Sequence, residues 1–232
     1  MTQLLLDLKP EQAPAFDNFV AGGNVELVSR LRALADPGCF DMIYVWGATG
    51  SGRSHLLAAT AAAAATRRHA LLCAGNEVGA ELHPPPGGLL LVDDADALSA
   101  AAQIALFRTF NSARLVGLAL LLSGPVPPLQ LQLREDLRTR IGQTLIYEVK
   151  PLSDDEKSAA LRRHALQRGM KVDENLVQYL MRHGRRDLPA LMAVLDGLDR
   201  SSLEQQRPAT LPLLKEVMQL QLETETNEPG SV

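Results

Sequence analysis

The sequence predicts an α/β unit, with a parallel sheet between helices, that is followed by a small all-helical domain. Short apolar runs alternate with helical segments over residues 40–149, and these runs are apolar along their whole length. Such runs are typical of parallel strands in a sheet that helices cover on both faces. A glycine-rich turn joins the first run to a helix, and beyond residue 150 only helical patterns remain.

The elements of the α/β unit follow in order along the chain. Apolar runs predict strands at residues 40–46, 69–74, 89–92, 115–122 and 144–149. Helical patterns lie at residues 24–35, 53–66, 99–112 and 134–141. Asn24 is placed to cap the first helix.

Four helices with clear start signals make up the C-terminal part of the chain. Ser153 and Glu156 form a capping box that opens a helix ending near residue 168. Asp173, Asp187 and Thr210 open three more helices, which end near residues 183, 205 and 222. We therefore divide the chain into an arm (1–15), an α/β domain (16–150), a helical domain (151–222) and a disordered tail (223–232).

Composition and charge narrow the classes of protein that this chain could represent. Of 232 residues, 46% are hydrophobic, which allows a sizeable core. The formal net charge of −4 gives no general attraction to nucleic acid, so we expect no direct sequence-specific DNA binding. Cys39 and Cys73 lie far apart without histidines at metal-binding spacing, which argues against a zinc site. Without a long apolar stretch or a signal peptide, the chain is expected to be cytoplasmic, with no membrane span.

A glycine-rich loop connects the first predicted strand to the helix at residues 53–66. It reads Gly47-Ala48-Thr49-Gly50-Ser51-Gly52-Arg53-Ser54, which has the GxxxxG[K/R]S spacing of a phosphate-binding P-loop. Glycines let backbone N–H groups surround phosphates, and the helix N-terminus adds a positive dipole end. Ser54 can bind Mg²⁺, whereas Arg53 replaces the usual lysine and keeps its charge but not its compact geometry. The alternative is a glycine-rich turn that binds no ligand.

A pair of carboxylates follows the third predicted strand. The segment Leu89-Leu90-Leu91-Val92-Asp93-Asp94 ends in acid where P-loop enzymes hold their metal ion. We assign Mg²⁺ binding to Asp93, directly or through water, and the orientation of a water molecule to Asp94. The alternative is that both acids, with Asp96, only cap the next helix.

A further segment carries a family resemblance. It reads Phe16-Asp17-Asn18-Phe19-Val20-Ala21-Gly22-Gly23-Asn24 and resembles the FDNFVVGxxN motif that opens the AAA+ domain of the DnaA family. The P-loop, the acid pair and the helical domain follow in matching order, so residues 3–222 look like a DnaA-type AAA+ P-loop module with a helical lid domain. Residues 150–157 and 195–202 resemble the Hda branch, the regulatory inactivators of DnaA. The resemblance implies ADP or ATP with Mg²⁺ as ligands, and Phe16, Val20 and His55 as further nucleotide contacts.

The N-terminal arm resembles the peptide with which Hda proteins dock on the DNA polymerase sliding clamp. It reads Gln3-Leu4-Leu5-Leu6-Asp7-Leu8, against QL[S/D]LPL in that branch. The resemblance implies clamp contacts from Gln3, Leu4, Leu6 and Leu8, with the clamp and DnaA as partners. A glutamine amide and leucines suit a short peptide that enters an apolar pocket. The alternative is an amphipathic arm that packs on its own domain.

Arg140 matches the position of the family's arginine finger, a residue that stabilises charge at a neighbour's γ-phosphate. Its alternative is a surface arginine paired with Asp136 or Glu135. Two positions depart from the family pattern, because the first nucleotide sensor falls near Pro125 and the second near Pro189. The alternative for the second sensor is that Arg185 or Arg186 substitutes for it.

These departures, together with Arg53, indicate weak ATP hydrolysis by the chain itself. The resemblance then implies a nucleotide-bound regulator of replication initiation that acts on DnaA through Arg140, and it leaves a homo-oligomer open. One alternative is an autonomous AAA+ ATPase, such as a helicase loader or a clamp-loader-like subunit. Another is a DNA-associated scaffold, which the acidic charge balance disfavours.

Overall fold

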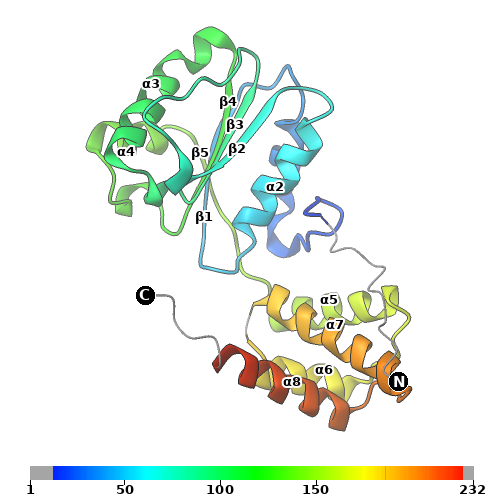
Figure 1. The fold of residues 1–232 in the computed structure, drawn as a ribbon. Coiled ribbons are helices and arrows are strands. Elements are labelled where there is room, and N and C mark those ends of the chain that lie inside the picture. Colours follow the sequence, from blue (N-terminus) through cyan, green and yellow to red (C-terminus); the bar gives the residue numbers. More distant parts are fainter. Residues whose placement is uncertain (1–12, 186, 227–232) are drawn as a thin grey trace. The chain divides into compact units, whose positions relative to one another are not determined.

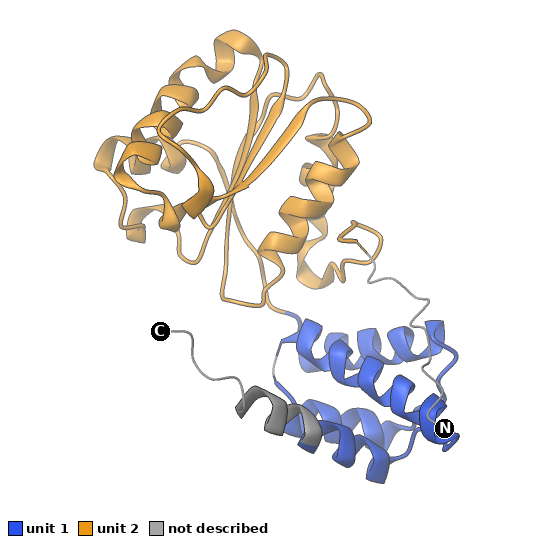
Figure 2. Ribbon diagram, viewed as in Figure 1, with its two compact units in different colours: residues 1–11, 152–232 blue, residues 12–151 orange. Residues whose placement is uncertain are grey.

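A computed structural model describes residues 13–185 and 187–226, with side chains described as far as residue 219. The chain folds into two compact units (Figure 2). The α/β unit ends at Pro151, and the helical unit starts at Leu152. The predicted clamp-binding residues and the end of the predicted tail lie outside the described residues.

A five-stranded parallel sheet forms the centre of the α/β unit (Figure 1). Its strands are β1 (Met42–Trp46), β2 (Ala70–Ala74), β3 (Leu89–Asp93), β4 (Ala119–Gly124) and β5 (Leu145–Glu148). They lie in the order β2-β3-β4-β1-β5, and every neighbouring pair is parallel. Because parallel strands end at the same edge, the loops that follow β1, β3 and β4 meet there.

Helices cover both faces of this sheet (Figure 1). One face carries α1 (Val25–Ala33) and α2 (Arg53–Ala64), and the other carries α3 (Ala100–Val116) and α4 (Glu135–Gly142). Side chains alternate between the two faces, as the two-residue period of a strand requires. In β1, Ile43 and Val45 pack in the cluster with α1 and α2, whereas Tyr44 packs in the cluster with α3 and α4. The predicted α/β fold is therefore confirmed.

The helical unit has its own core. Its helices are α5 (Asp154–Gln167), α6 (Glu174–His183), α7 (Leu188–Gln205) and α8 (Leu211–Thr226). Leucines such as Leu161, Leu180 and Leu195 are fully buried among them. The predicted capping box is present, since Ser153 Oγ accepts from Glu156 N–H and the Glu156 carboxylate accepts from Ser153 N–H. We expected α8 to end near residue 222, but it runs to Thr226.

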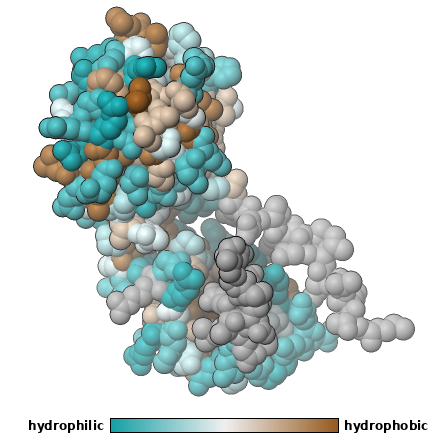
Figure 3. Space-filling model, turned by 60° about the vertical axis from the view of Figure 1, so that its left-hand side comes forward, coloured by the Kyte–Doolittle hydropathy of each residue, from teal (hydrophilic) through white to brown (hydrophobic). Residues whose placement is uncertain are grey.

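The prediction that every strand is buried on both faces is wrong for the two edge strands. In β2, Leu71 and Leu72 are 39% and 41% exposed, and in β5 Leu145 and Ile146 are exposed to a similar degree. Each of these strands has only one neighbour in the sheet, and the flanking helices leave part of its surface open. On the face of the molecule drawn in Figure 3, apolar residues lie singly or in small groups among hydrophilic ones.

The boundary between α3 and β4 also differs from the prediction. We expected a strand at residues 115–122, but α3 continues to Val116 and β4 starts at Ala119. Gly117 ends the helix in the left-handed region, with φ of +62°, as glycines commonly do at helix C-termini. Leu115 therefore lies on the outside of a helix and is almost fully exposed.

Candidate nucleotide-binding site

The predicted P-loop runs from the end of β1 into the first two residues of α2, and its geometry requires glycine at two positions. Gly52 has φ of +99°, in the left-handed region that other residues rarely adopt. A Cβ atom on Gly47 would lie 2.9 Å from both Ser51 Oγ and the Val149 carbonyl oxygen. The loop therefore folds back on itself closely, directly before the N-terminus of a twelve-residue helix.

Two polar groups in this loop are buried without a hydrogen-bond partner among the described residues. They are Ser51 Oγ and Arg53 Nη1, and the Arg53 side chain is only 10% exposed. Leaving a buried polar or charged group unpaired is costly, so such groups indicate a missing ligand when they meet at a helix N-terminus. A hydroxyl, a guanidinium and the free N–H groups of a helix start form a donor set that fits a phosphate. Ser54, the predicted Mg²⁺ ligand, is exposed at the second residue of α2.

The predicted acid pair lies at the end of β3, beside the end of β4. Ser123, the buried fifth residue of β4, donates its hydroxyl to Asp93 Oδ1. The same hydroxyl accepts the backbone N–H of Asp94 at 2.8 Å. The alternative of simple helix caps is not observed for Asp94, whose side chain makes no capping bond to the 3-10 helix Ala95–Ala97. Instead, its Oδ1 lies 3.2 Å from Arg53 Nη2.

This contact joins the P-loop to the acid pair. Burial raises the pKa of the Asp94 carboxyl, and the charge of Asp93 raises it further, while Arg53 partly opposes both effects. Asp94 also has φ of +49°, a strained backbone conformation that its N–H bond to Ser123 helps to hold. The structure thus brings Arg53, Asp93 and Asp94 together at one edge of the sheet, as their positions in the sequence predict.

Ser123 is a site residue that sequence reasoning did not single out. We expected the first nucleotide sensor near Pro125 and read that proline as a lost contact. The structure instead places a serine hydroxyl two residues earlier, bonded to both acids. A polar residue at the end of an otherwise apolar buried strand was the signal that could have identified it.

The FDNFV segment lies against the P-loop through Phe19, whereas Phe16 packs in the core. Phe16 is buried in the core cluster of α1 and α2, and the Arg32 guanidinium covers its ring at 4.8 Å from the centroid. Phe19 contacts the loop, since a Cβ on Gly52 would lie 2.8 Å from Phe19 Cε2. His55 Nε2 lies 3.0 Å from the Ala15 carbonyl oxygen, and Val20 is half-buried in the same segment.

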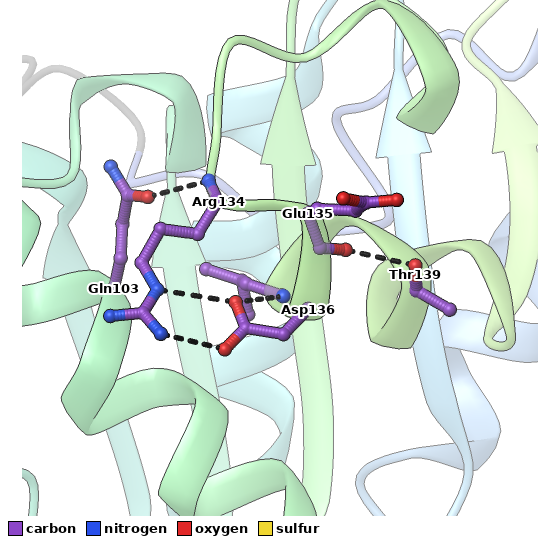
Figure 4. A network of polar contacts seen from close by, with 6 residues as sticks. Gln103, Arg134, Glu135, Asp136 and Thr139 are labelled. Carbon is purple, nitrogen blue, oxygen red and sulfur yellow. Dashed lines mark hydrogen bonds and ion pairs between the residues drawn. The ribbon is translucent and has the colours of Figure 1, made fainter.

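Arg140 lies exposed on α4, apart from the P-loop contacts. Its Nη1 lies 3.4 Å from Gln143 Oε1, so it makes neither of the pairings proposed as alternatives. Asp136 is held by Arg134 through two hydrogen bonds, of 3.2 and 2.8 Å, as Figure 4 shows. The Glu135 carboxylate has no hydrogen-bond partner among the described residues. The Arg140 side chain is therefore available to a partner.

Figure 4 also shows how the start of α4 is fixed. The backbone N–H of Arg134 donates to Gln103 Oε1 on α3 at 2.9 Å, and Asp136 Oδ1 accepts the N–H of Leu137. The Arg134 hydrogen bonds and charge lower the pKa of Asp136, so this carboxylate stays ionised near neutral pH. These contacts set the direction of the helix that carries Arg140.

In the helical unit, Pro189 is the second residue of α7 and does not disturb the helix. Asp187 caps α7 by accepting the N–H of Ala190 at 2.9 Å. Arg185 lies 3.5 Å from Asp187, and Arg186 is outside the described residues. A proline in a helix's first turn loses no internal bond.

Two acids of the Hda-like segment 195–202 hold α5 against α7. Asp196 Oδ1 lies 2.6 Å from His164 Nε2 and 2.7 Å from Arg168 Nε. Arg168 also reaches Asp199 at 3.5 Å. The His164 side chain is half-buried in this network.

Comparisons with known proteins agree with this architecture. Residues 154–218 match the family model described as "Hda, lid domain". The chain is similar in fold to domain III of the replication initiation protein DnaA from Thermotoga maritima. That alignment has a TM-score of 0.77 at 17% identity and covers 91% of this chain and 98% of that chain. Residues 154–218 thus carry an Hda-type lid domain, and the chain has the fold of DnaA domain III.

Two further solved structures share the fold of this chain. AMPPCP-bound DnaA from Aquifex aeolicus aligns with a TM-score of 0.65 at 18% identity, covering 82% of this chain and 65% of that chain. The Holliday junction branch migration motor RuvB from Thermotoga maritima aligns at 0.64 and 14% identity, covering 84% and 69%. Among the described residues, no helix has the length and apolar character needed to cross a bilayer. No three potential metal-ligating side chains (His, Cys, Asp or Glu) cluster in residues 13–185 and 187–226.

Proposed function

We propose that this protein is a nucleotide-bound regulator of bacterial replication initiation that docks on the DNA sliding clamp and stimulates ATP hydrolysis on DnaA. The observation that carries the proposal is one chain with a DnaA-type α/β unit, an Hda lid domain and an exposed arginine on α4. A regulator of this kind works in the cytoplasm and reaches the nucleoid through the clamp.

The ligand that we propose is ADP or ATP with Mg²⁺. The P-loop N–H groups, Ser51 Oγ and Arg53 would hold its phosphates, and Ser54 and Asp93 would hold the metal ion. When bound, this metal ion would neutralise phosphate charge. Phe19 and His55 would border the nucleotide from the FDNFV side. The ion pair between Arg53 and Asp94 supports weak hydrolysis by the chain itself, because it engages the cation and the carboxylate that hydrolysis would use.

On this proposal, Arg140 acts on the nucleotide of DnaA rather than on its own. A guanidinium that reaches a neighbour's γ-phosphate stabilises the charge that develops during transfer, and such residues contribute about 10³–10⁵ in rate. The Arg140 side chain is exposed and makes a long contact to Gln143. Extending the side chain toward a partner would therefore break only a weak hydrogen bond.

The test of the finger uses stimulation of DnaA by the full chain. Arg140→Ala should reduce the stimulation of ATP hydrolysis by DnaA at least about 10²-fold. Arg138→Ala, on the same helix and without a described partner, is the matched control and should retain it. If Arg140→Ala stimulates hydrolysis as well as Arg138→Ala does, Arg140 is not part of the mechanism. ATP turnover by the isolated chain would support the autonomous ATPase instead.

Clamp docking is tested separately through the arm. Binding of the purified chain to its own sliding clamp is compared with that of the double variant Gln3→Ala/Leu6→Ala. Loss of binding supports docking through Gln3, Leu4, Leu6 and Leu8. Unchanged binding would leave the clamp as a partner but exclude this arm as the contact.

A further inference from the structure

Residues Ala15–Asn24, here called the strap, run from the P-loop to the last residues of the α/β unit. Near its start, the Ala15 carbonyl oxygen lies 3.0 Å from His55 Nε2 in the first turn of α2. Phe19 lies against Gly52, and its ring centroid is 5.5 Å from that of His55. This end of the strap therefore rests on the loop that is proposed to bind phosphate.

The other end of the strap holds Lys150 through one side chain. Asn24 Nδ2 donates to the Lys150 carbonyl oxygen at 3.0 Å, and Asn24 Oδ1 accepts the Lys150 N–H at 2.8 Å. Asn24 is only 4% exposed, so its amide is buried, whereas Lys150 itself is exposed. The prediction that Asn24 caps α1 is therefore wrong, because its side chain makes no capping bond to the helix. It bonds instead to Lys150, which lies 126 residues further along the chain.

Lys150 lies where the sheet ends and the path to the helical unit begins. The last sheet bond of this segment runs from the Val149 N–H to the Trp46 carbonyl oxygen at 2.7 Å. Beyond it, the Asn24 amide supplies both partners of the Lys150 backbone, as a neighbouring strand would. Pro151 has no N–H to donate, and the helical unit starts at the next residue. Asn24 thus fixes the final residue before the connection between the two units.

We propose that Asn24 is a positioning residue that links nucleotide binding at the P-loop to the Lys150–Pro151 connection through the strap. The inference rests on the proposed binding of nucleotide. Ser51 Oγ and Arg53 Nη1 gain partners when a phosphate binds, so the loop around Gly52 adjusts. Phe19 packs so closely on Gly52 that a shift of the loop must also move the Phe19 ring.

The strap is stiff enough to pass this adjustment on. Between Phe19 and Asn24, the Asn24 N–H donates to the Ala21 carbonyl oxygen at 2.8 Å. Before Phe19, Asp17 pairs with Arg32 of α1 at 2.8 Å. The 3-10 helix Gly22–Asn24 then leads directly into α1. A movement of Phe19 therefore reaches Asn24 through a hydrogen-bonded segment rather than through a flexible loop.

The experiment follows amide hydrogen exchange at Lys150 in the full chain, with and without ADP, while a fluorescent ADP analogue measures affinity. In the wild type, saturating ADP should slow exchange of the Lys150 N–H by about tenfold. In Asn24→Ala this N–H should exchange fast and without response to ADP, while the dissociation constant for ADP changes less than about threefold. Asn18→Ala is the matched control, since its side chain bonds only to Ala13 and Ala15, before Phe19, and it should keep the response at Lys150.

Each outcome decides the inference. An ADP response at Lys150 that persists in folded Asn24→Ala overturns it, as does a wild type that binds ADP without any response there. If Asn24→Ala fails to fold, Asn24→Asp keeps an acceptor for the Lys150 N–H but loses the donor to its carbonyl, and should show a weakened response. Absence of ADP binding by the wild type would overturn the proposed nucleotide site as well, and so is distinguishable from failure of the strap alone.

Discussion

Arg68 is expected to be the most sensitive charged residue of the α/β unit. Arg68 is 8% exposed, and its guanidinium makes six hydrogen bonds to the carbonyl oxygens of five residues: Leu34, Asp36, Cys39, Gly87 and Gly88. These carbonyls belong to the loops at the amino ends of the strands. Burial lowers the pKa of Arg68, because desolvation opposes its charge. The hydrogen bonds to the carbonyl oxygens offset the cost of burying this charged group.

The magnitude follows from the groups that a substitution would leave unpaired. Arg68→Met fills a similar volume but removes every donor, and an unpaired buried carbonyl costs about 1–3 kcal/mol. Because water can reach some of the five carbonyl groups, we count the cost of two unpaired carbonyls. The free energy of unfolding should therefore fall by about 4 kcal/mol. Arg68→Lys should lose nearly as much, since three donors on a flexible stem cannot serve five carbonyls.

Urea unfolding followed by Trp46 fluorescence measures this loss. Trp46 is the only tryptophan and ends β1, so its signal reports the α/β unit. With a slope of about 2 kcal/mol per M urea, the midpoint should fall by about 2 M. Arg67→Met, at the exposed neighbouring position, should change it little. An Arg68→Met midpoint within about 0.5 M of the wild type would refute the reasoning.

Three further substitutions test other contacts. Gly52→Ala should weaken ADP binding more than about tenfold, because it strains the backbone and displaces Phe19, and equal affinity in a fluorescence titration would contradict the loop geometry. Asp196→Asn should lower the free energy of unfolding of the helical unit by about 1–2 kcal/mol, because it weakens the bond to Arg168. An unchanged value in calorimetry would mean that the network does not stabilise the unit. Tyr44→Phe should lose about 1 kcal/mol by urea unfolding, as the Val126 carbonyl loses its 2.6 Å donor, and a more stable variant would argue against that bond.

Local patterns were sufficient to predict the sheet and the phosphate loop. The glycines at 47, 50 and 52 and the acids at 93 and 94 are close in sequence to the elements that orient them, so spacing determines their place. The same holds for the capping box at Ser153, where both partners lie within four residues. Ser54 and Asp93 reach the same edge of the sheet because parallel strands share their direction.

Other features depend on contacts between distant residues, and local patterns could not predict them. Asn24 has the ideal identity for a helix cap, yet its partner is Lys150. Arg68 follows an alanine-rich helix and gives no local sign of its five acceptors. The edge positions of β2 and β5 depend on strand order, which apolar content alone does not determine. The start of β4 was misplaced because Leu115 and Val116 continue an apolar run across Gly117.

The open edges of the sheet have a practical consequence for handling the protein. Leu71 and Leu72 on one edge, and Leu145 and Ile146 on the other, place apolar side chains beside unpaired backbone groups. Such edges favour strand-to-strand aggregation when a protein is concentrated. Replacing Leu72 or Ile146 by lysine should raise the concentration at which the chain stays monodisperse, which would help crystallisation.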